Sequence, residues 1–163
     1  MVFNSPTELW PGCIEQIAPG AFSSSLGGDI RALVDHETRL VLGRTTAGTL
    51  TLREDESGLY GEIKINPNDS DAMNLYARVQ RGDVSQCSFG FEIVSEDYIV
   101  GSDGQTCTWT IHDLILYEVS VVTFPAYEAT SAYARDADDM ASLRTARLNR
   151  RRQELLERIN KLC

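Results

Sequence analysis

The chain has 163 residues, of which 42% are hydrophobic, a size and a balance that suit one globular domain with an appendage. The formal net charge of −9 lies in the body, since residues 1–134 hold 7 Lys or Arg against 19 Asp or Glu. An acidic body argues against a nucleic-acid-binding surface, and no apolar run approaches the roughly 20 residues that cross a bilayer. We therefore expect neither nucleic acid nor a membrane as a partner.

Most of the chain up to Tyr127 shows the two-residue alternation of β-strands. Leucine and isoleucine alternate with polar residues at residues 50–52 and 59–65, on either side of a turn at residues 54–58, which predicts a hairpin. The sequence GSDG at Gly101–Gly104 marks a second turn.

Two further β segments follow that turn. Cys107, Trp109 and Ile111 alternate with threonines. The stretch Ile115–Phe124 is long, β-branched and apolar, and it stops at Pro125, so we predict a second strand there.

One internal segment has helical periodicity instead. Apolar residues recur at helical spacing through residues 72–79, with start signals at Asp69 and Ser70 and a stop signal at Gly82. The single apolar stripe is typical of a helix packed on a β-core.

The last part of the chain changes character. Residues 128–138 are small and polar, which predicts a linker, and residues 139–163 are predicted to form a C-terminal helix. Its apolar residues repeat every seven positions, at Ala141, Leu148, Leu155 and Leu162, so the helix could pack on the body, dimerise or bind another protein. For residues 1–127 we predict a mainly β fold with peripheral helices (α+β), a closed or nearly closed antiparallel β-barrel.

The four cysteines, Cys13, Cys87, Cys107 and Cys163, have no spacing typical of a zinc site, and no metal or organic cofactor is indicated. Without a secretory signal, a reducing compartment is expected. Cys87 and Cys107 share strand faces with apolar neighbours, so we interpret both as buried thiols.

The chain has two histidines, and each follows a predicted strand. His36 lies in Asp35–Glu37, directly after the apolar residues 32–34, and His112 follows Ile111. Histidine is suited to proton transfer near neutral pH, but a polar triplet at a strand end is also common in simple turns.

The segment QCSFGFE at residues 86–92 alternates two kinds of side chain. Cys87 falls on one strand face with the phenylalanines, which we predict to be the core side. Ser88 falls on the opposite, accessible face, where Gly90 leaves space beside it. By itself this pattern fits a surface serine as well as a nucleophile.

Glu118 is almost the only ionisable residue in an apolar strand, and it shares a face with Ser120. Burying a carboxylate without a partner costs several kcal/mol, roughly, so either this face is exposed or Glu118 has a hydrogen-bond partner such as a histidine N–H.

Five segments in order, beginning after VFNS at Val2–Ser5, resemble the prohead proteases of tailed bacteriophages, the serine proteases that mature the procapsid. The segments are IAPGAF (17–22), LVDHETRLVLGRT (33–45), DESGLYGEIKI (55–65), RGDVSQCSFGFE (81–92) and YEVSVVTFPAY (117–127). Members usually carry a further strand before VFNS and a longer C-terminal region. The family is similar in fold to the herpesvirus assembly proteases, a β-barrel ringed by helices.

The resemblance implies roles for three residues. Ser88 matches the family's nucleophile, His36 its base, and Glu118, before VS, the third member. In the herpesvirus enzymes a second histidine fills that third place, which makes His112 the rival candidate.

The implied function is an endopeptidase that cleaves the major capsid protein and the scaffold protein inside the phage procapsid, in the host bacterial cytoplasm. Analogy with the herpesvirus enzymes implies a homodimer. Two other functions are alternatives. One is a non-catalytic barrel that acts in procapsid assembly or scaffolding. The other is a cysteine peptidase that uses Cys87, but the strand alternation argues against it, because Cys87 shares a face with Phe89 and Phe91.

Overall fold

The computed structural model describes residues 2–134, which form a β-rich unit with one helix. The elements are β1 (Thr7–Trp10), β2 (Cys13–Ile17), β3 (Arg31–Val34), β4 (Glu37–Arg44), β5 (Leu50–Glu54), β6 (Leu59–Ile63), α1 (Ser70–Arg81), β7 (Gln86–Val100) and β8 (Cys107–Val122). The predicted C-terminal helix at residues 139–163, with its heptad repeat, lies outside the described residues, as does the end of the predicted linker.

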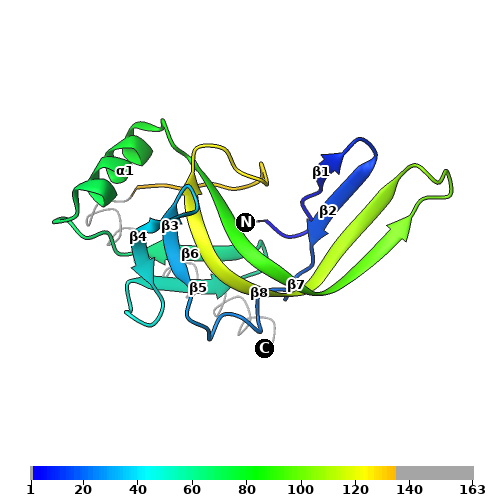
Figure 1. The fold of residues 1–163 in the computed structure, drawn as a ribbon, viewed down its shortest axis with the longest axis horizontal. Helices are drawn as coiled ribbons and strands as arrows, with labels where there is room; N and C mark the ends of the chain where they lie inside the picture. Colours follow the sequence, from blue (N-terminus) through cyan, green and yellow to red (C-terminus); the bar gives the residue numbers. More distant parts are fainter. Residues whose placement is uncertain (1, 135–163) are drawn as a thin grey trace, which may run out of the picture. The chain divides into compact units, whose positions relative to one another are not determined.

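Strand β8 is the centre of the larger sheet. On one edge it pairs in parallel with two strands, β2 along residues 107–111 and β3 along residues 118–121. β7 runs antiparallel along its other edge, and β1 and β4 extend the sheet beyond β2 and β3. Figure 1 shows β7 and β8 as one long, bent hairpin, and the pairing register shifts at Gly90/Phe91 and on both sides of Ser95. Such irregularities bend a strand pair.

This sheet differs from the predicted antiparallel barrel in two respects. It is mixed, because both strands on one edge of β8 are parallel to it, and β5 and β6 form a separate two-stranded sheet. Within residues 2–134 the strand pairs form an open path, so a closed barrel stays a prediction. Alternation of side chains identifies strands, but it says nothing about which strands become neighbours.

The local predictions are confirmed where the chain pairs with itself at short range. The hairpin is β5–β6, with Leu50 opposite Ile63, and the Gly101–Gly104 turn joins β7 to β8. The two predicted late strands are one continuous strand, β8.

Helix α1 has the predicted ends. The Asp69 side chain accepts hydrogen bonds from the N–H groups of Asp71 and Ala72, and Gly82 ends the helix in the left-handed conformation with φ 86°. Ala72 and Leu75 are buried on its inner face. No helix among residues 2–134 combines the length and the apolar character needed to span a membrane.

The core contains an aromatic cluster around Phe89. The centroid of its ring lies 5.5 Å from the ring centroid of Phe22, 4.8 Å from that of Phe91 and 5.4 Å from that of Tyr127. The Tyr127 hydroxyl donates to the Glu15 carboxylate, and burial, together with this bond, raises the pKa of Tyr127 well above its usual value. The chain that leaves β8 is therefore fixed to the core at Tyr127.

The first residues of the predicted linker lie along β7. The Cys87 N–H donates to Thr130 Oγ1 at 3.0 Å, and the Ala132 N–H donates to the Ser85 carbonyl at 2.8 Å. These bonds occupy the start of β7, on the edge that β8 does not use.

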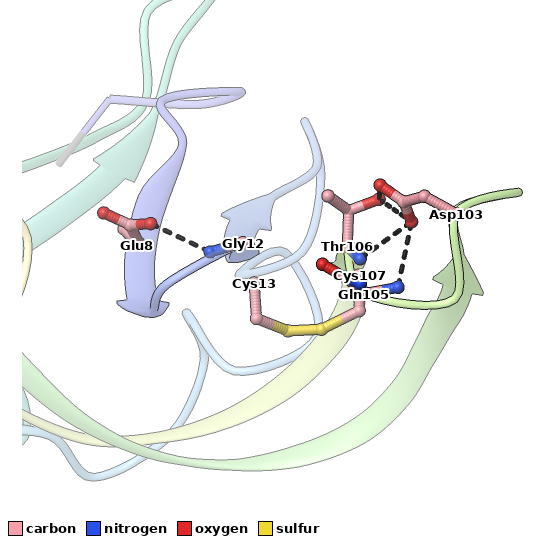
Figure 2. The surroundings of a disulfide bond; sticks show 7 residues. All are labelled: Glu8, Gly12, Cys13, Asp103, Gln105, Thr106 and Cys107. Carbon is pink, nitrogen blue, oxygen red and sulfur yellow. Dashed lines mark hydrogen bonds between the residues drawn. A yellow bond between two sulfur atoms is a disulfide. The ribbon is translucent and has the colours of Figure 1, made fainter.

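Cys13 and Cys107 form a disulfide, which corrects the interpretation of Cys107 as a free buried thiol. Figure 2 shows the bond between β2 and the start of β8, beside the turn in which Asp103 accepts from the N–H groups of Gln105 and Thr106. The parallel register places the two cysteines directly opposite each other, with their Cα atoms 4.5 Å apart. That separation lies within the usual range for disulfides.

Candidate active site

His36 lies in a strained two-residue turn. Asp35 and His36 join β3 to β4, with Val34 paired to Glu37, and both have positive φ, 46° and 61°. Positive φ at both central residues is the signature of a type I′ hairpin turn, for which Asn-Gly is the favoured sequence. The turn is fastened to the end of β8, because the Asp35 N–H donates to the Val121 carbonyl at 3.0 Å and the Asp35 carboxylate accepts the N–H of Thr123, the residue after the strand, at 2.7 Å. Positive φ is unfavourable for a residue with a Cβ atom, so the surrounding contacts must hold this conformation.

This strain predicts a difference between two variants that both lack the imidazole. His36→Gly is expected to be more stable than His36→Ala by about 1 kcal/mol, because only glycine accepts positive φ without a steric penalty. Denaturant unfolding of both variants measures this difference. Equal stabilities, or a more stable alanine variant, would contradict the left-handed conformation at this position.

The Glu118 carboxylate lies against the His36 ring. Glu118 Oε1 is 2.6 Å from His36 Nδ1, and the Glu118 side chain is only 12% exposed while that of His36 is 45% exposed. A carboxylate can only accept, so this contact places the ring proton on Nδ1 and leaves the Nε2 lone pair able to accept a proton. Glu118 thus has the histidine N–H partner that its place in an apolar strand called for.

Gly90 makes room for this carboxylate. It is the antiparallel partner of Glu118 on β7, and a Cβ atom added to Gly90 would lie 2.7 Å from Glu118 Oε1. The space predicted beside Ser88 is therefore filled by the side chain of Glu118.

Ser88 shares this face of the sheet. It is directly opposite Ser120, and Gly90 is opposite Glu118, so all four side-chain positions point to the same side. Ser88 and Ser120 reach the site from neighbouring strands, and the His36 turn reaches it from the other edge of β8. The structure thus gathers Ser88, His36 and Glu118 on one face.

The prediction that Ser88 lies on an accessible face is wrong in its burial, because the residue is 3% exposed while Cys87 is half-buried. Ser88 is the third residue of β7 and is paired with Ser120 of β8, which is also buried. Among residues 2–134, every fully buried side-chain oxygen or nitrogen has a hydrogen-bond partner. The Ser88 hydroxyl has no hydrogen-bond partner among these residues. Its oxygen is therefore not one of the fully buried atoms and keeps some contact with solvent.

Comparison with known proteins shows which family this chain belongs to. The family model described as caudovirus prohead serine protease matches residues 1–143, a span that includes Ser88, His36 and Glu118. The chain belongs to the caudovirus prohead serine protease family. It is 34% identical over 133 residues to the prohead protease of Enterobacteria phage HK97, a match that covers 78% of this chain and 56% of that protein. The chain therefore spans little more than half the length of this relative. No solved structure matches it.

Cys87 has the wrong environment for the nucleophile of this family member. Burial raises the pKa of its thiol, and its Sγ donates to the Ser131 carbonyl at 3.4 Å. A reactive cysteine needs a lowered pKa, because the thiolate is the attacking species. These observations argue against a cysteine peptidase that uses Cys87 and favour a serine protease.

His112 is on the other half of β8. Its Nε2 is 2.9 Å from Asp97 Oδ2, in an exposed pair on the β7–β8 hairpin. It lies six positions before Glu118 on the same strand, a distance of about 20 Å at the usual rise per residue. The structure brings Glu118, and not His112, to His36.

Sequence reasoning missed two participants, Asp35 and the hydroxyl of Ser120. The Asp35–His36 turn carried no Asn-Gly signal, so its type was not recognisable. The shared face of Glu118 and Ser120 was visible in the alternation, and it was the signal that could have pointed to Ser120. Among the described residues no group of three or more His, Cys, Asp or Glu is placed to hold a metal ion.

Proposed function

We propose that this chain is a serine endopeptidase that cleaves capsid and scaffold proteins during phage head maturation. Ser88 is the nucleophile, His36 the general base and Glu118 the group that orients His36. The observation that carries the proposal is the 2.6 Å contact between His36 Nδ1 and Glu118 Oε1, on the sheet face that Ser88 shares. Membership in the prohead serine protease family supports it.

In this mechanism each residue has one task. His36 Nε2 removes the proton as Ser88 Oγ attacks the scissile carbonyl, and it then gives that proton to the leaving amine. Glu118 keeps the imidazole in the required tautomer and stabilises the imidazolium that forms. A low exposure of the carboxylate strengthens this interaction, because less water screens it.

The setting is part of the same proposal. The prohead protease of phage HK97 is a relative, and its name places that protein in the prohead. We infer that the present chain works inside the procapsid, in the host bacterial cytoplasm, with the major capsid protein and the scaffold protein as substrates. The closed barrel and the homodimer are also predictions that further structural work can test.

A fluorophosphonate probe tests the serine-protease proposal without knowledge of the cleavage site. Such a probe forms a bond between its phosphorus and an activated serine oxygen, with loss of fluoride. The full chain is expected to be labelled at Ser88, Cys87→Ala is expected to be labelled equally fast, and Ser88→Ala is expected to remain unlabelled. An unlabelled wild type would favour the non-catalytic assembly component, and labelling that survives in Ser88→Ala would place the nucleophile elsewhere.

A further inference from the structure

Ser120 is a buried polar residue whose hydroxyl both donates and accepts a hydrogen bond. Apart from Ser88 it is the only buried polar residue among residues 2–134, with 2% exposure. Its hydroxyl donates to Glu118 Oε2 at 2.5 Å and accepts the backbone N–H of His36 at 3.2 Å. Both of these hydrogen bonds join the hydroxyl to the two residues proposed to act with Ser88.

These contacts form a closed ring of hydrogen bonds. The His36 ring donates to one oxygen of Glu118, and the His36 backbone is joined through Ser120 to the other oxygen. A carboxylate held at both oxygens cannot rotate without breaking a bond. This closed set of hydrogen bonds therefore fixes both the orientation of the Glu118 carboxylate and the position of the strained His36 turn.

An apolar residue would satisfy packing at this position. The neighbouring residues on β8 are valines, Val119, Val121 and Val122, and β8 supplies several core residues. A hydroxyl shielded from water costs free energy unless it is hydrogen-bonded. A serine whose only described side-chain partners are Glu118 and His36 is best explained by what it does for them.

We propose that Ser120 is a positioning residue of the active site, which holds Glu118 in the orientation that receives His36 Nδ1–H. The proposal rests on the proposed function for its effect on rate. Its structural part, the control of the His36–Glu118 contact, can be measured in an inactive protein.

The rate test uses fluorophosphonate labelling of the full chain. Ser120→Ala is expected to lower the inactivation rate constant by about 10- to 100-fold, the effect of losing one hydrogen bond to a charged group, with little change in the apparent affinity for the probe. Ser120→Thr keeps the hydroxyl and is expected to recover most of the rate. Labelling of Ser120→Ala at the wild-type rate would overturn the proposal.

A second measurement separates positioning from general destabilisation and needs no activity. In the Ser88→Ala background, proton NMR of the His36 ring follows the Nδ1–H that donates to Glu118. The Ser88→Ala protein is expected to show this low-field signal, and the signal is expected to disappear when Glu118→Ala is added. When Ser120→Ala is added instead, the signal is expected to shift or broaden while the chain still unfolds cooperatively. An unchanged signal in Ser88→Ala/Ser120→Ala would overturn the positioning role.

The two measurements fail differently. If the wild type is not labelled but the Nδ1–H signal responds to Ser120→Ala, the proposed function fails and the hydrogen-bond ring stands. If the wild type is labelled and Ser120→Ala changes neither rate nor signal, the proposed function stands and Ser120 is only a packing residue.

Discussion

Substitution of Ser88 by alanine is expected to lower the rate of capsid-protein cleavage by about six orders of magnitude, the usual result of removing a nucleophile. Glu118→Gln is expected to cost about four orders, because an amide in place of the carboxylate favours the wrong histidine tautomer. The major capsid protein of the same phage is co-expressed with each full-length variant, and its cleavage is followed by measuring the masses of the products.

His112→Ala is the matched control for Glu118→Gln. His112 is paired with Asp97 on the exposed hairpin, about 20 Å along β8 from Glu118, so its loss is expected to leave cleavage near the wild-type rate. The opposite result, an inactive His112→Ala beside an active Glu118→Gln, would transfer the third role to His112. Unchanged cleavage by Ser88→Ala would reject the serine mechanism itself.

The sequence predicted those parts of the fold that depend on nearby residues. The β5–β6 hairpin and helix α1 follow from periodicity and from end signals such as Asp69 and Gly82, which act within a few residues. The parallel pairing of β2 and β3 with β8 joins residues about 90 positions apart, and no local signal encodes it. That pairing is what changed the predicted antiparallel sheet into a mixed one.

The candidate site was predictable in its members but not in its geometry. The resemblance to a family supplied Ser88, His36 and Glu118, and alternation correctly placed Ser88 and Cys87 on opposite strand faces. Alternation did not give burial, because the exposure of Ser88 depends on residues that are distant in the sequence, such as its partner on β8. The position of the Glu118 carboxylate over Gly90 was not predictable either, because only the strand register shows which residue of β7 is opposite Glu118.

The cysteines show the same limit. Their number and spacing allowed several pairings. The pairing of Cys13 with Cys107 results from the parallel register of β2 and β8, which holds the two residues opposite each other.

Reduction of this disulfide is expected to lower the free energy of unfolding by about 4 kcal/mol, because the bond closes a long loop and restricts the unfolded chain. The loop spans 94 residues and joins the start of β2 to the start of β8. Denaturant unfolding with and without a thiol reductant measures the change. Cys87→Ala should keep this sensitivity to reductant, and Cys13→Ala/Cys107→Ala should lose it.

The disulfide is expected to affect stability far more than chemistry. Cys107 is eleven residues before Glu118 on β8, about 36 Å along an extended strand, so its loss should leave the His36–Glu118 contact intact. Fluorophosphonate labelling of reduced and oxidised protein under conditions where both are folded should therefore give equal rates. A large loss of labelling on reduction would show that the far end of the β7–β8 hairpin helps to hold the active site in place.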